Sequence, residues 1–334
     1  MPTPQPAQAG TLYGKMRRTM NSSRLLRKVT LFRLTGFVWA VFRYVTIIGL
    51  GYLILHPLLL MLSSAFMHAS DLSDSTVVWI PKTFTLDNFK AALYFMHYKE
   101  AFFNSLFLAV STTLLHVCTC TFVGYGFARF RFRGRNVLFA LVLLTLIVPP
   151  QALMIPTFLH FRFFDFFGVI EMLTGKPGLN LLDTFWPFLL LSATGMGYKN
   201  GLYILIMRQF FRGLPGELEE AALVDGAGVF RTFYRIMLPN AVPAIVTILL
   251  FSFVWQWNDY FFVNLFLENM KVLPLTLDSM ATNISTTIGY PLDPFRQSMI
   301  NNTGSLLVIL PLVILYLFAQ RYFIEGIERS GLVG

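Results

Sequence analysis

The sequence predicts an all-α integral membrane protein with six transmembrane helices. Of its 334 residues, 55% are hydrophobic and only 13% are charged, so the chain is far more apolar than an average soluble domain. The 35 phenylalanines are spread through the apolar segments, which suits helices that pack against lipid and one another. Six segments also have the roughly 20 apolar residues that a helix needs to cross a hydrocarbon core of about 30 Å.

The segment before the first span has two parts, which together form region 1–43. Residues 1–23 are rich in Pro, Gln, Ser and Thr and are predicted to be disordered. In residues 24–43, basic residues are interleaved with Leu, Val, Phe and Trp, which predicts an amphipathic helix at the cytoplasmic membrane interface. No cleavable signal peptide is expected, because no small-residue cleavage site follows at the right place. The predicted membrane domain, 44–323, contains spans at 44–66, 101–125, 136–158, 184–207, 241–263 and 301–323.

The distribution of lysine and arginine predicts the orientation, because cytoplasmic loops of membrane proteins are enriched in both. Of the 26 basic residues, 18 lie in the N-terminal region, the loop 129–135, the loop 208–240 and the tail. The other eight lie in the remaining loops or within spans. Both termini and the loop 208–240 are therefore expected to be cytoplasmic. The net charge of +9 follows this pattern, and no nucleic-acid-binding motif accompanies it.

Two predicted spans contain irregular features. In the third span, Pro149, Pro150 and Pro156 predict a kink, which either lines a cavity or has a purely structural role. The polar loop 208–240 follows the fourth span and predicts two short helices. Acidic residues favour the start of the first helix, and Gly226 ends it. Aromatic residues at helical spacing mark the second, which is expected to end at Pro239.

This loop carries a recognisable signature. Glu-Ala-Ala at 220–222 is followed after three residues by Gly, after nine more by Ile, and after one more by Leu-Pro. The sequence here resembles the membrane subunits of binding-protein-dependent ABC importers. The stretches 79–89, 104–106 and 124–135 are similar to carbohydrate permeases of this superfamily, so the resemblance covers roughly 44–334 and places the chain near the maltose-type permeases. The resemblance implies the ABC importer type I permease fold, with 208–240 as a coupling loop that docks in a cleft of a separate ATPase. The residues assigned to coupling are Glu219, Glu220, Ala221, Ala222, Asp225, Gly226, Ala227, Ile236, Leu238 and Pro239.

The same resemblance implies the function and the partners. It implies a permease subunit of a bacterial ABC importer in the cell membrane, forming part of the path of a carbohydrate, an oligosaccharide. Its partners would be a second, different permease, two copies of a cytoplasmic ATPase and an extracytoplasmic sugar-binding protein. The cytoplasmic tail, 324–334, resembles family tails that reach the ATPase, with Gln320 and Gly326 as candidate contacts and Val333 where lysine is common. No Walker-type phosphate loop is present, so a partner must bind the ATP.

Polar residues inside two spans are candidates for the substrate path. A lysine such as Lys199 costs about 3 kcal/mol near mid-membrane, so it should face a cavity, a partner or the interface. A helix break or an ion pair without substrate contact is the alternative. The stretch 255–260 combines aromatic faces with polar groups, which suits a sugar, although an aromatic belt at the interface would look the same. The candidates are Lys199, Asn200, Trp255, Trp257, Asn258 and Asp259.

A self-sufficient secondary transporter or channel is the alternative function. Such a protein predicts intramembrane carboxylates or an internal repeat, whereas the spans offer few acidic residues beyond Asp259 and no clear repeat. No enzyme is indicated, because no nucleophile and base converge. His116 and Cys120 share a helix face, but a metal site needs more ligands than this pair. No metal or other cofactor is therefore expected.

Overall fold

The computed structural model describes residues 7–331 apart from 75 and 78. These residues form helices and no β-sheet, with isolated bridges only between Met67 and Phe84 and between Phe164 and Leu179. The chain divides into two compact units, Met1–Ser63 and Ser64–Gly334. The all-α prediction is confirmed over the part of the chain that the structure describes.

The described part of the first unit lies within a single helix, α1 (Ala7–Ala65). Its segment Gly36–Ala65 is long and apolar enough to cross a membrane, and it contains nearly all of the predicted span 44–66. Residues 7–23 have a helical backbone where the sequence predicts disorder, and residues 1–6 lie outside the described residues. The helix can run on because no proline occurs between Pro6 and Pro57.

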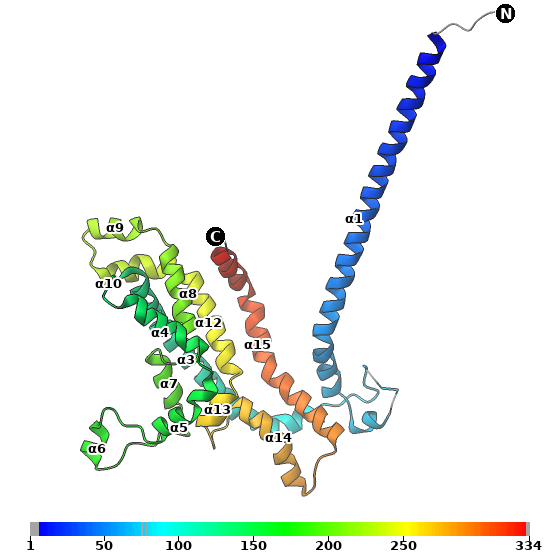
Figure 1. The fold of residues 1–334 in the computed structure, drawn as a ribbon. Coiled ribbons are helices and arrows are strands. Elements are labelled where there is room, and N and C mark those ends of the chain that lie inside the picture. The colour runs from blue at the N-terminus through cyan, green and yellow to red at the C-terminus, as the bar shows by residue number, and fades with distance from the viewer. Residues whose placement is uncertain (1–6, 75, 78, 332–334) are drawn as a thin grey trace, which may run out of the picture. The chain divides into compact units, whose positions relative to one another are not determined.

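The second unit is built around α3 (Tyr98–Arg129). It packs against α7 (Trp186–Ala193), α8 (Asn200–Gly213) and α12 (Val242–Trp257), as Figure 1 shows. Both α3 and the first part of α15 (Pro294–Gly331) are long and apolar enough to span a membrane. The predicted second and sixth spans therefore lie within continuous helices.

The predicted third span, 136–158, is bent within its length, and a second bend lies at the start of the predicted fifth span, 241–263. Helix α4 (Arg135–Ile147) meets the segment Pro150–Arg162 at 101°, where Pro149 and Pro150 interrupt the helix as predicted. That segment consists of a short 3-10 turn, η2 (Pro150–Leu153), and α5 (Met154–Arg162). The segment Val229–Asn240 meets α12 at 72°. The described residues thus contain three helices that meet the criteria for a span, or five if each bent pair counts as one. The number six stays a prediction.

The predicted fourth span, 184–207, is broken rather than continuous. Helix α7 ends at Ala193 and α8 begins at Asn200, with residues 194–199 between them. Gly195 has a φ of 74°, a left-handed backbone conformation that glycine adopts without steric cost. The break places Tyr198 and Lys199 beside α12 instead of within a regular helix.

Short helices form the end of the second unit that is opposite α9 and α10 (Figure 1). Among them, α6 and α14 lie at the far end from α9, and α13 directly precedes α14 in the chain. The short elements are η1 (Ala69–Ser73), α2 (Asp87–Phe95), α6 (Val169–Thr174), α13 (Phe261–Phe266) and α14 (Leu273–Ile288).

A carboxylate ties two of the connections in this unit together. Oδ1 of Asp183 accepts backbone hydrogen bonds from Asn269 at 2.9 Å and from Glu268 and Met270 at 3.1 Å. Partial burial acts to raise the pKa of Asp183, but these hydrogen bonds outweigh it and hold the pKa below its usual value. The contact fixes the segment before α7 against the segment between α13 and α14.

Candidate functional site

The first half of the loop 208–240 is α9 (Glu217–Val224), which lies at the same end of the second unit as the C-terminal end of α15 (Figure 1). Three glutamates occupy its first turn, where the positive end of the helix dipole stabilises them. Gly226 has a φ of 77°, and the next amide, of Ala227, donates to the carbonyl of Ala222 at 2.9 Å. This is a Schellman-type helix end, so the prediction that Gly226 ends the first helix is confirmed.

The second half of the loop departs from its predicted boundary. It comprises α10 (Val229–Thr232), a π-helical turn, η3 (Phe233–Met237), and α11 (Leu238–Asn240). The prediction that Pro239 ends the helix is wrong, because the helical backbone continues to Asn240. Pro239 lies in the first turn of α11, where a missing amide donor is tolerated.

The signature residues face two different ways. Glu220, Ala221, Asp225 and Gly226 are exposed, and Pro239 is exposed as well. In contrast, Ala222 is only 4% exposed and belongs to the core of the second unit. The sequence assigns all of these residues to a docking surface, but a buried Ala222 has no accessible surface to offer a partner. Ala227, Ile236 and Leu238 are partly buried, and the last two pack on a core cluster that contains Met237 and Phe233.

Glu219 also faces its own chain. The hydroxyl of Tyr125 donates to Glu219 Oε1 at 2.9 Å, and Nε of Arg129 lies 3.7 Å from Glu219 Oε2. Arg129 Nη2 also donates to the carbonyl of Leu214 at 2.7 Å. These contacts tie α9 to the C-terminal end of α3. Of the two adjacent glutamates, only Glu220 is free to meet another protein.

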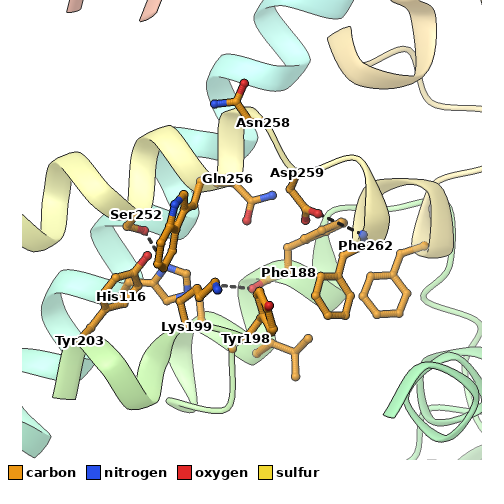
Figure 2. Close-up of a pocket in the computed structure, with 15 residues that line it drawn as sticks. His116, Phe188, Tyr198, Lys199, Tyr203, Ser252, Gln256, Asn258, Asp259 and Phe262 are labelled. Atoms are coloured by element: carbon orange, nitrogen blue, oxygen red, sulfur yellow. Dashed lines mark hydrogen bonds between the residues drawn. The ribbon is translucent and has the colours of Figure 1, made fainter. Parts of the chain in front are cut away.

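A cavity of about 370 Å³ lies where the break between α7 and α8 faces α3 and α12 (Figure 2). Aromatic and polar side chains together line its walls, and such a combination is typical of small-molecule sites. Four of the six substrate-path candidates line it: Lys199, Trp255, Asn258 and Asp259.

Lys199 is the charged group at the centre of this arrangement. Its Nζ lies 4.1 Å from the ring centroid of Tyr198 and 4.2 Å from that of Trp255. Both distances are within the range of cation–π attraction. Among the described residues, no carboxylate lies within ion-pair distance of Lys199. Two aromatic faces therefore stabilise the ammonium group, which keeps its hydrogen-bonding capacity for a ligand or water.

The other polar candidates are held by local contacts. Asp259 Oδ1 accepts a hydrogen bond from the amide of Phe262 at 3.1 Å, which fixes the carboxylate beside α13. Asn258 lies apart from Lys199 in Figure 2, and its Nδ2 donates to the carbonyl of Val254 at 2.8 Å. Asp259 thus adds a partly buried acceptor to the wall, while Asn258 stands at its margin.

Two sequence-predicted residues lie elsewhere. Trp257 is 1% exposed, and its Nε1 donates to the carbonyl of Val308 in α15 at 3.1 Å. Residues two apart on a helix point about 200° from each other, so Trp255 and Trp257 face opposite sides of α12. Asn200 is fully buried and does not line the cavity either. The expectation that these two residues face the path is corrected accordingly.

The structure adds to the cavity two polar residues that the sequence does not assign to the substrate path. His116 of α3 and Ser252 of α12 line the cavity, with 2.7 Å between His116 Nδ1 and Ser252 Oγ. His116 Nε2 is buried and has no hydrogen-bond partner among the described residues. In the sequence, these residues could be recognised only as polar side chains inside otherwise apolar spans, where polar groups tend to be functional.

The structure describes the candidate residues of the tail less fully than the others. Gln320 is exposed, and its Nε2 donates to Leu317 within α15 at 3.2 Å. Gly326 lies in the part of α15 of which only the backbone is described, and Val333 lies outside the described residues. Within the described part of the chain, no group of three or more His, Cys, Asp or Glu residues could hold a metal ion.

Comparisons with known proteins agree with this architecture. The chain is 31% identical over 262 residues to the arabinooligosaccharides transport system permease protein AraQ of Bacillus subtilis, covering 76% of this chain and 81% of AraQ. It is 28% identical over 291 residues to the maltodextrin transport system permease protein MdxG of the same organism, covering 87% and 95% of the two chains.

A solved structure shares the fold. It is the crystal structure of a bacterial ABC transporter involved in the import of the acidic polysaccharide alginate. The TM-score is 0.69 at 22% identity, covering 86% of this chain and 96% of that chain. Residues 120–328, more than half of the sequence, match the family described as binding-protein-dependent transport system inner membrane component. This multi-pass membrane protein therefore belongs to the binding-protein-dependent transport system inner membrane component family.

Proposed function

We propose that this chain is a transmembrane permease subunit of a bacterial ABC importer that carries an oligosaccharide and couples to separate ATPase subunits through α9. The relatives named for arabinooligosaccharide and maltodextrin transport support the substrate class. The exposed side of α9, with Glu220 and Gly226, supports the docking surface. Other subunits of the importer would be a different permease, two ATPase copies and an extracytoplasmic sugar-binding protein.

The observation that supports this proposal most is that one helix, α3, contacts α9 and also lines the cavity. Helix α3 holds α9 through Tyr125 and Arg129, and it lines the cavity with His116. His116 and Tyr125 are nine residues apart, about 14 Å along the helix axis. A displacement of α9 by the ATPase would therefore reach the cavity through a continuous helix.

The cavity would form this subunit's share of the substrate path. Trp255 and Tyr198 offer ring faces on which the C–H face of a sugar can stack. The Lys199 ammonium and the Asp259 carboxylate offer a donor and an acceptor for sugar hydroxyls. ATP-driven closure of the ATPase dimer would open this region to the outside, and hydrolysis would reverse the change.

Site-specific cross-linking tests the docking surface. In a chain without Cys118 and Cys120, a cysteine at Val224 would carry a photoreactive cross-linker in membranes that contain the complete importer. Val224 is 87% exposed at the end of α9, so we expect a cross-linked product with the ATPase. A cysteine at Met172, which is 83% exposed on α6 at the opposite end, is the matched control. Equal products from both sites, or a product from Met172 alone, would refute the proposed docking.

A further inference from the structure

Five arginines converge on a cleft of about 480 Å³ beside α9. They come from three parts of the chain: the end of α3, the connection to α4 together with the first residue of α4, and the last turns of α8. Two carboxylates, of Glu219 and Glu220, also line the cleft, so three positive charges remain in excess. The five arginines are Arg129, Arg131, Arg135, Arg208 and Arg212.

Most of this charge has no carboxylate partner among the described residues, although Arg135 Nη1 donates to the carbonyl of Phe130 at 3.2 Å. Among the described residues, Arg129 alone of the five forms an ion pair, with Glu219. Arg208 is only 9% exposed, its guanidinium lies 3.8 Å from the ring centroid of Phe139, and its Nε has no hydrogen-bond partner among the described residues. A buried guanidinium of this kind is stabilised when an anion completes its hydrogen bonds. The cleft is therefore built to receive an anion.

The location of the cleft indicates which anion it would take. Arg208 precedes Arg212 by four residues, so the arginines of α8 cover about 6 Å of depth along that helix. Arg135 is the first residue of α4, an apolar helix on which Val137 is 65% exposed. A second cleft of about 320 Å³ shares Arg131 and Arg135 and extends to Val137. The positive charge is thus continuous with an apolar helix surface that suits acyl chains.

We propose that this arginine cleft binds the phosphate of an anionic phospholipid headgroup, with the acyl chains along α4. Guanidinium groups match phosphate oxygens in geometry and charge, and basic pockets on the cytoplasmic side of membrane proteins hold such headgroups. Glu219, which ties α9 to α3, forms part of the same wall. A bound lipid therefore stabilises the position of α9, which makes coupling sensitive to lipid composition. This proposal goes beyond carbohydrate transport and does not depend on the identity of the sugar.

Lipid retention by the purified complete importer tests the proposal. The importer would be equilibrated with phosphatidylglycerol or phosphatidylcholine of the same acyl chains, and bound lipid would be counted by native mass spectrometry. The test variant is Arg131→Gln/Arg212→Gln, in which both changed side chains are exposed, so that folding is preserved. The control is Arg231→Gln/Arg235→Gln, which removes the same charge from exposed sites of the same loop outside the cleft. We expect phosphatidylglycerol affinity to fall about fivefold per removed arginine in the test variant alone, with phosphatidylcholine binding unchanged.

Three other results would overturn the proposal. Equal losses in the test and control variants would indicate a general charge effect rather than a site. Complete displacement of the lipid by excess inorganic phosphate would assign the cleft to a soluble phosphate. Release of the ATPase from the test variant with unchanged lipid retention would assign the arginines to acidic side chains of that partner. Because the measurement counts bound lipid and not transported sugar, its failure would leave the proposed transport function intact.

Discussion

Glu220→Lys and Gly226→Asp are each expected to abolish carbohydrate uptake while the chain remains inserted in the membrane. Glu220 is exposed on α9, so its charge reversal changes the surface offered to the ATPase and no contact of the core. Gly226 has a φ of 77°, where a side chain costs about 1 kcal/mol, although no atom lies within 4 Å of the added Cβ. Uptake, together with the amount of ATPase that co-purifies, measures the effect.

The control for these variants is Glu171→Lys, a charge reversal at an exposed site of α6, at the opposite end of the unit. It should leave uptake and ATPase co-purification at wild-type levels. Because Glu220 is expected to face a basic residue, reversing that partner charge should restore part of the Glu220→Lys activity. Wild-type uptake and co-purification in both α9 variants would contradict the docking of α9.

Replacing each of two neighbouring tryptophans by alanine is expected to have opposite consequences. Trp257→Ala should lower the amount of folded protein, because it empties a core site between Phe102 and Phe253 and removes the hydrogen bond to Val308. Such a loss costs about 3–5 kcal/mol of folding free energy. Trp255→Ala should leave the fold and the complex intact and reduce uptake, since a lost stacking contact with substrate costs about 1–3 kcal/mol.

Thermal unfolding of the purified importer and uptake by cells would be measured for both variants. The two tryptophans lie on one helix and undergo the same substitution, so each serves as the control of the other. Normal uptake by a well-assembled Trp255→Ala importer would remove this cavity from the substrate path. A stable Trp257→Ala protein with a transport defect alone would contradict the buried position of Trp257.

The first helix of the loop 208–240 could be predicted from sequence in detail because its features are local. Acidic residues at a helix start and a glycine just past its end act within a few residues, so Gly226 terminates α9 as expected. The helix end predicted at Pro239 was wrong because the effect of this proline depends on the π-helical turn before it, which no local sequence rule indicates. The burial of Ala222 likewise depends on what packs beneath α9, and composition does not contain that information.

The cavity was harder to predict because it is assembled from segments far apart in the sequence. The polar and aromatic residues of the stretch 255–260 stand out within an apolar segment. The direction of each side chain, however, depends on how α12 packs against α3 and α15. Lys199 can be recognised in the sequence as a candidate because a charge within an apolar segment is costly. Ser252 is neutral, so its presence in a span is a much weaker indication of function. The sequence predicts only that the arginines of the cleft lie on the cytoplasmic side. Their convergence on one cleft depends on the packing of α8 against α3 and α4.

Uptake by proteoliposomes tests most directly whether this chain works through a partner ATPase. The complete importer would be reconstituted with ATP supplied to the ATPase side and with the binding protein and a labelled oligosaccharide on the other side. We predict accumulation that requires ATP and the binding protein, and that stops when the ATPase cannot hydrolyse ATP. Accumulation by the chain alone, driven by an ion gradient without ATPase or ATP, would contradict this account and identify a secondary transporter.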